Sequence, residues 1–307
     1  MSRKTKDRTA LAVMILFFIT AIVSGMAAVY IRGKPRYHYE VRKDLSVHFT
    51  NADRVIESIR TAMRERSKSI TITYTSHSDN MEDIDDVVSE LMHYAVYETD
   101  RADEGDYLRY QSGGYDLNYT CEKKGNDREY ELVITPRLYT DPEQEEEVNE
   151  KLEQVIESFG FDEDTSDYEI VRTVYDYIYQ NVDYDVIHKK NDSYHLKATA
   201  YGALINGHAV CQGYAVLMYR MLRECGVDCR VITGMAYDEE LGEEFHAWNI
   251  VRIDGEYYNI DVTWDKQLES EVFFLKGDKD FTSHKRDNEF ITDEFYEQYP
   301  MSQYSYE

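Results

Sequence analysis

The chain has 307 residues, with 60 acidic against 34 basic side chains and a formal net charge of −26 at pH 7. Such an acidic chain is not expected to bind nucleic acid through phosphate contacts, whereas it attracts cationic partners such as lysine-rich protein segments. Its four cysteines are too few for a disulfide framework, although a bridge between Cys225 and Cys229 stays open at this stage.

The N-terminus predicts a membrane anchor. Residues 10–31 carry no charged side chain and follow a short basic tail, and about 20 apolar residues suffice to cross a bilayer as a helix. The stretch exceeds the apolar region of a secretory signal, about 7–15 residues, so we expect residues 1–36 to form an uncleaved signal anchor, with cleavage near Ala27 left open. A basic tail before one span usually stays in the cytoplasm, which predicts a single-pass cell-membrane protein with an extracytoplasmic body.

Residues 37–140 are expected to form a small α+β domain. Asn51 can cap a first helix, the apolar spacing over residues 84–95 predicts a second one, and residues 70–74 resemble a strand. Two alternating strands then flank a polar turn at residues 123–127. No chemistry is indicated, and the roles of spacer, substrate-presenting module and steric guard all stay open.

Residues 141–307 are expected to form a second α+β domain that begins with helices. Pro142 begins a helix that runs to Gly160, and Ser166 caps the next one, with Glu169 completing a capping box. An apolar stripe over residues 210–225 predicts a further helix, which ends at a glycine.

The strands of this domain follow that last helix. We expect strands at residues 229–232, 245–253, 256–262 and 271–275, and the turn Asp254-Gly255 is typical of a type I′ hairpin. With that turn, the numbers of paired residues sum to 509. His246 and Asp261 are then diagonal neighbours on one sheet face, about 7–8 Å apart, so that their side chains can form a hydrogen bond.

Three reactive side chains lie on these elements in chain order. Cys211 lies at the start of a helix, where unpaired N–H groups and the helix dipole favour a thiolate. His246 and Asp261 follow on the predicted hairpin. A thiol, an imidazole and a carboxylate are the parts of a cysteine nucleophile, its base and the group that orients the base.

Around these residues the chain resembles the transglutaminase-like superfamily, whose core pairs a helix-borne cysteine with a histidine and an aspartate on neighbouring strands. The resemblance covers about residues 166–265, includes the lead-in at 198–204, and is closest to a bacterial branch with an anchored or secreted domain. It implies a papain-like or transglutaminase-like core with Cys211 as nucleophile, His246 as general base and Asp261 as orienting acid. Because the superfamily also contains proteases, peptide glycanases and inactive members, the resemblance implies a fold and a triad more specifically than a reaction.

Metal sites fit the sequence less well. A zinc site of Cys211, Cys225, Cys229 and His246 lacks a Cys-x-x-Cys knuckle, and its first two cysteines lie about 20 Å apart at opposite ends of one helix. The acidic run at residues 162–167 lacks the glycine and the final acid of a calcium loop. We therefore predict no metal and no cofactor.

Trp248 and Trp264 have two open interpretations, as core side chains or as a slot that shields the thiolate and grips the acyl donor.

The sequence thus predicts an extracytoplasmic cysteine enzyme acting on protein or peptide amide bonds through a thioester. The backbone N–H of Cys211 is expected to bind the oxyanion, together with a second donor that stays unassigned among Tyr201, Asn206 and His208. Water as acceptor gives a peptidase or amidase, that is, a hydrolase, and a lysine amine gives a transglutaminase, that is, an acyltransferase. The alternative is a non-catalytic cell-surface protein that binds proteins or wall material.

Overall fold

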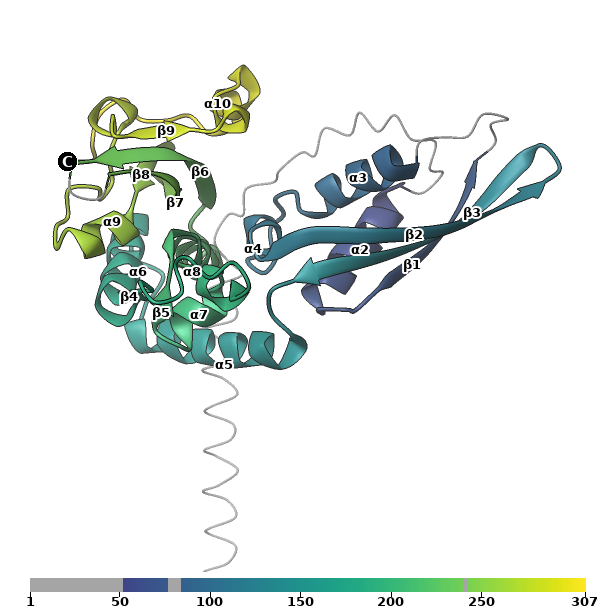
Figure 1. Ribbon diagram of the computed structural model, residues 1–307. Helices are drawn as coiled ribbons and strands as arrows, with labels where there is room; N and C mark the ends of the chain where they lie inside the picture. The colour runs from purple at the N-terminus through teal and green to yellow at the C-terminus, as the bar shows by residue number, and fades with distance from the viewer. Residues whose placement is uncertain (1–51, 77–83, 240–241) are drawn as a thin grey trace, which may run out of the picture.

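The computed structural model describes residues 52–76, 84–239 and 242–307, which form two α+β bodies (Figure 1). In the smaller body, helices α2 (Ala52–Arg64) and α3 (Ile84–Ala95) pack on a three-stranded antiparallel sheet. Its strands are β1 (Ile70–Ser76), β2 (Ser112–Lys124) and β3 (Asp127–Leu138), in the order β1-β3-β2. The core is formed where alternate β3 residues meet the apolar stripes of the helices, among them Tyr130, Leu132 and Ile134.

The larger body begins with two capped helices. In α5 (Pro142–Phe159), Asp141 is the N-cap of a capping box with Gln144, and Pro142 occupies the first turn. In α6 (Asp167–Asn181), Ser166 and Glu169 form the predicted capping box. Each cap satisfies N–H groups that have no partner within the helix and stabilises it by about 1 kcal/mol.

The central helix of this body is α8 (Cys211–Glu224), and residues 213–222 of it are all buried. Before it come β4 (Asp183–Tyr184), the 3₁₀ turn η1 (His195–Ala198), α7 (Ala200–Leu204) and β5 (His208–Ala209), and β4 pairs in parallel with β5. Gly213 lets the first turn of α8 approach this layer, because a Cβ there would lie 2.9 Å from the Lys197 carbonyl oxygen and 2.8 Å from the Ala209 Cβ. The backbone around Cys211 is therefore tightly placed.

The sheet of the larger body has the order β8-β7-β6-β9. Its strands are β6 (Cys229–Asp238), β7 (Gly242–Ile253), β8 (Glu256–Ile260) and β9 (His284–Arg286), and all neighbours are antiparallel. The predicted type I′ turn is confirmed by positive φ at Asp254 (52°) and Gly255 (97°). The predicted register is confirmed as well, since Asn249 pairs with Ile260 and Ile253 with Glu256.

The sheet has helix α8 on one face and the C-terminal region on the other. Ala247 and Val251 of β7 join the core around α8, whereas Trp248 and Ile250 pack with a second cluster that includes Phe281. The C-terminal region consists of η2 (Asp278–Asp280), η3 (Asn288–Phe290), α10 (Asp293–Gln298) and the loops between them. Figure 1 shows α10 beside the edge strand β9, at the end of the larger body away from α5.

One predicted strand is two residues too long, and another is wrong. The second hairpin strand ends at Ile260, because Asp261 accepts hydrogen bonds from the N–H groups of Thr263 and Trp264 and thereby begins helix α9 (Val262–Gln267). Residues 271–275 form a loop instead of a strand. The Phe273 N–H there is bound by the Asp265 carboxylate, which replaces strand pairing.

The predicted membrane location is also contradicted. Within the described ranges, no helix combines the length and the apolar character needed to cross a bilayer. The longest described helix is α5, whose 18 residues include seven glutamates. The expected span, residues 10–31, lies outside the described residues, so the transmembrane helix of the predicted fold and the predicted extracytoplasmic, cell-surface body have no support.

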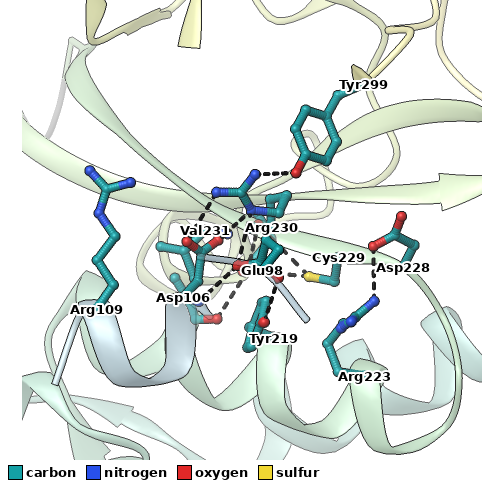
Figure 2. A network of polar contacts seen from close by, with 12 residues as sticks. Glu98, Asp106, Arg109, Tyr219, Arg223, Asp228, Cys229, Arg230, Val231 and Tyr299 are labelled. Atoms are coloured by element: carbon teal, nitrogen blue, oxygen red, sulfur yellow. Dashed lines mark hydrogen bonds and ion pairs between the residues drawn. The ribbon is translucent and has the colours of Figure 1, made fainter. Parts of the chain in front are cut away.

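A buried polar network joins the segment after α3 to the larger body (Figure 2). The Asp106 carboxylate at the start of α4 (Asp106–Arg109) lies 2.8 Å from Nε of Arg230, and the Glu98 carboxylate lies 3.4 Å from the same atom. Tyr219 of α8 donates to Glu98 at 2.7 Å, and Arg230 donates to Tyr299. Removing one charge would leave another buried without compensation, at about 3–5 kcal/mol, so the network fixes α8 against the sheet.

Candidate active site

Cys211 is the first residue of α8 and is half-buried. Its N-cap, Val210, offers no side-chain acceptor, and the first-turn N–H groups of Cys211 and Gln212 have no carbonyl acceptor within the helix. The N-terminal end of the helix dipole favours negative charge at this position. The thiol therefore lies where the sequence predicted it, at the N-terminus of a helix.

His246 and Asp261 form a direct hydrogen bond. Nε2 of His246 lies 2.7 Å from Oδ2 of Asp261, and neither side chain is exposed to solvent. Because the carboxylate is the acceptor, Nε2 of His246 carries the hydrogen. The other ring nitrogen, Nδ1, is buried, has no hydrogen-bond partner among the described residues, and is left for Cys211.

The charges of His246 and Asp261 stabilise each other. Burial alone lowers the pKa of His246, but Asp261 and Cys211 outweigh it and raise that pKa to about 10. Burial likewise acts to raise the pKa of Asp261, and its bonds to His246 and to a second histidine, His284, bring that pKa well below its usual range. At neutral pH the arrangement is therefore a carboxylate beside an imidazolium, with the sulfur of Cys211 at the remaining ring nitrogen.

Residues 158–262 match the family model described as the transglutaminase-like superfamily. This stretch contains all three side chains. The chain carries a transglutaminase-like domain. Its fold is mixed α+β, as the resemblance implied.

The transglutaminase-like domain is similar to part of two curated relatives. The chain is 32% identical over 142 residues to kyphoscoliosis peptidase of Mus musculus, which is 42% of this chain and 21% of the relative. It is 30% identical over 175 residues to kyphoscoliosis peptidase of Homo sapiens, which is 50% of this chain and 26% of the relative. The alignment thus spans about a quarter of the length of these relatives.

Among solved structures, one described as the crystal structure of a TGase is 18% identical, covers 49% of this chain and 45% of that chain, and has a TM-score of 0.34.

His284 is a further member of the site that sequence reasoning missed. Its Nε2 lies 3.0 Å from the same Oδ2 of Asp261, its side chain is fully buried, and its Nδ1 lies 2.9 Å from the hydroxyl of Ser283. Burial lowers the pKa of His284, so it is a neutral donor to the carboxylate. No local motif marks this residue, because it reaches the site only through the pairing of β9 with β6.

A glycine in β6 allows β9 to pair closely with β6. Gly234 of β6 lies opposite both His246 and Arg286, and a Cβ there would lie 2.0 Å from the Lys285 carbonyl oxygen. Any side chain at this position would push β9, and His284 with it, away from Asp261. The glycine is the one sequence signal of this arrangement.

Aromatic rings enclose both imidazoles. The Trp264 ring centroid lies 5.0 Å from that of His246 and 4.7 Å from that of His284, and Phe281 stacks on His284 at 4.0 Å. Trp248 and Trp264 are 1% and 0% exposed, so both belong to the core and do not line an open slot. This buried aromatic shell strengthens the hydrogen bonds to Asp261.

A metal ion is the alternative explanation for this cluster. His246, Asp261 and His284 each offer one ligand atom, and the three atoms lie within 4.8 Å of one another. However, the same atoms are already joined by hydrogen bonds of 2.7 and 3.0 Å, in a pocket without solvent exposure. The cluster fits a hydrogen-bonded site better than a metal centre.

Of the four residues of the zinc-site alternative, Cys225 and Cys229 are both buried, and no disulfide joins them.

The second oxyanion donor stays unassigned, although the structure narrows the choice. The hydroxyl of Tyr201 donates to Glu147 of α5, and Asn206 and His208 are exposed. Tyr184 of β4, which the sequence did not single out, interacts electrostatically with Cys211. Burial and that interaction raise the pKa of Tyr184 to about 12, so its hydroxyl keeps its proton and can donate near the thiol.

Proposed function

We propose that this chain is a cysteine enzyme that acts on protein or peptide amide bonds through a thioester at Cys211. The observation that carries the proposal is the buried bond of 2.7 Å between His246 and Asp261, which leaves one ring nitrogen of His246 for a cysteine at a helix N-terminus. A structural histidine has no need of a raised pKa or an unsatisfied buried nitrogen. Such features cluster at functional sites.

The first half of the reaction follows from the charges. The Cys211 thiolate attacks the amide carbonyl, a carbon–sulfur bond forms, and the carbonyl electron pair moves to the oxygen. The first-turn N–H of Cys211 stabilises that oxyanion. When the intermediate collapses, the carbon–nitrogen bond breaks, and the amine leaves with the proton from Nδ1 of His246, while Asp261 holds the ring in place.

The second half depends on the acceptor. His246, now neutral, removes a proton from water or from an amine, which attacks the thioester and displaces the thiolate. Water gives a carboxylic acid and a hydrolase, whereas a lysine amine gives a new amide and an acyltransferase. The name of the curated relatives, kyphoscoliosis peptidase, supports a peptide bond as the substrate.

The first test measures iodoacetamide labelling of each cysteine in the full chain as a function of pH. An ordinary thiol has a pKa of about 8.5, so selective labelling of Cys211 well below that pH, and its loss in His246→Ala, is the expected result. Cys225 and Cys229 are internal controls, because both are buried. Absent or ordinary reactivity at Cys211 would reject the enzyme and leave a non-catalytic binding scaffold.

The second test separates the two acceptors. Casein is incubated with a labelled primary amine and the enzyme, with Cys211→Ala as the control. Label in casein that depends on Cys211 means transfer, and casein fragments without label mean hydrolysis.

A further inference from the structure

We infer that the sheet surface next to Cys211 docks the acyl side of a peptide substrate that carries an apolar side chain beside the reacting residue and a basic side chain beyond it. This inference rests on the proposed function and names its substrate class. It is carried by the register of β6 and β7, the exposure of three side chains, and a loop that is tied both to the residues before Cys211 and to β7.

The register places the surface at the thiol. Asn249 of β7 donates to the carbonyl oxygen of Ala215, one turn after Cys211, and Ala247 lies next on the same sheet face. The following residue on that face is Phe245, which therefore lies beyond the N-terminal end of α8. Met235 of β6 is directly opposite Phe245.

This part of the sheet is exposed although it is apolar. Phe245 is 61% exposed, Met235 39% and Tyr237, two residues further along β6, 57%. The helix covers the same face only up to Cys211. Three large apolar side chains on one face, continuous with a reactive cysteine, form a surface that favours a ligand.

The loop that follows β4 is tied to the residues before Cys211 and to β7. The N–H of Asp185 donates to the carbonyl oxygen of Ala209, two residues before Cys211, and Lys189 forms an ion pair of 2.5 Å with Glu244, next to Phe245. Lys197 donates to three carbonyl oxygens of the loop, those of His188, Lys189 and Asn191, at 2.8–3.0 Å.

The tethers hold two more apolar side chains in solvent. Val186 is 75% exposed and Ile187 82%. The loop thus spans from the residues before Cys211 to the strand that carries Phe245. Burying these side chains against a substrate would stabilise the complex, and their fixed backbone keeps the entropy cost low.

The charged residues around this surface indicate which substrate residue lies beyond the apolar one. Asp238, Glu239, Glu243 and Glu244 surround this end of the sheet, against Lys189, which pairs with Glu244, and Lys285, opposite Met235. The surplus of acids attracts a basic residue. The acyl side is the part concerned, because it remains bound to Cys211 through both halves of the reaction.

The experiment uses three tripeptidyl chloromethyl ketones, Lys-Phe-Gly, Lys-Ser-Gly and Glu-Phe-Gly, which alkylate the thiolate by displacing chloride. We expect the first to modify Cys211 of the full chain about tenfold faster than the second and about threefold faster than the third. In Met235→Ser/Phe245→Ser the preference for phenylalanine disappears, whereas iodoacetamide labels Cys211 at the wild-type rate. Ile291→Ser, an exposed apolar residue outside this surface, is the matched control and keeps the preference.

The outcomes separate this inference from the proposed function. If iodoacetamide does not label Cys211 selectively, the proposed function fails. If it does, but the wild type shows no preference among the peptides or the double variant keeps it, the docking surface is wrong. A dimer in sedimentation analysis that the double variant abolishes, with unchanged alkylation rates, would assign the surface to contact between two copies of the chain and overturn the inference.

Discussion

Replacing Asp261 by Asn tests the charge arrangement most directly. Asparagine also caps helices well, so its oxygen can keep the bonds to the N–H groups of Thr263 and Trp264 that begin α9. What changes is the atom that faces the imidazoles, where a donating NH₂ replaces a carboxylate oxygen. His246 must then turn its Nε2 into an acceptor and place its hydrogen on Nδ1, the atom that has to receive a proton from Cys211.

The magnitude follows from the pKa of His246. Asp261 and Cys211 raise that pKa from 6.5 to about 10, which corresponds to roughly 5 kcal/mol of preference for the protonated ring. Asp261 contributes more than Cys211 to the raised pKa of His246. We therefore expect the loss of its charge to bring that pKa to or below 6.5 and to slow amide turnover by at least about a hundredfold.

The sign of the stability effect is fixed by the same shift. The folded chain binds the proton of His246 more tightly than the unfolded chain does. This stabilisation is therefore complete below about pH 6.5 and disappears as the pH rises through about 10. We expect Asp261→Asn to lower the free energy of unfolding by about 3 kcal/mol at pH 6.5 and by much less near pH 10.5.

Two assays check these values. Nuclear magnetic resonance of the histidine rings gives the pKa of His246 in both proteins, and urea unfolding at the two pH values gives the stability difference. If His246 of the variant still titrates near pH 10, Asp261 is not the main source of its basicity and the reasoning is refuted.

Three further substitutions probe the surroundings of the triad. His284→Phe keeps the aromatic shell but removes a donor to Asp261, so we expect about tenfold slower iodoacetamide labelling of Cys211. The amide of His284→Gln can still donate, so this variant should recover most of the wild-type labelling rate. Equal rates in both variants would exclude a positioning role for His284. Tyr184→Phe should leave iodoacetamide labelling unchanged and slow amide turnover about tenfold, since only the amide forms an oxyanion; a parallel loss of labelling would indicate damage to the site instead. Gly234→Ala forces β9 away from β6 and should lower the urea midpoint by an amount equivalent to about 1–3 kcal/mol of unfolding free energy. An unchanged midpoint would show that β9 can shift without loss of stability.

The sequence predicts this site well where the signals are local. The turn Asp254-Gly255 sets the hairpin register through its backbone conformation, and that register alone brings His246 near Asp261. The capping box at Ser166 and the apolar stripe of α8 are likewise properties of adjacent residues. Such patterns do not depend on the rest of the chain, which is why they are confirmed.

The failures have a common cause in side-chain contacts that follow no periodic pattern. Asp261 looked like a strand residue, yet its carboxylate begins a helix with one oxygen and binds two histidines with the other. His284 follows 23 residues later on a strand of three residues. Neither the bifurcated role of Asp261 nor the pairing that delivers His284 leaves a periodic trace in the sequence.

The parts that support Cys211 extend beyond the residues that match the family model. Gln212, beside the thiol, donates to the backbone oxygen of Tyr110, and the side chain of Gln111 accepts from the N–H of Ala200 at 2.9 Å. These contacts tie the segment after α4 to the first turn of α8 and to the start of α7, and the Asp106–Arg230 pair anchors α4 to the sheet. With His284 arriving from the other end of the chain, residues 158–262 hold the three reactive groups but not all the side chains that position them. A fragment limited to those residues would expose buried partners on both sides, so assays of this chemistry call for the full chain.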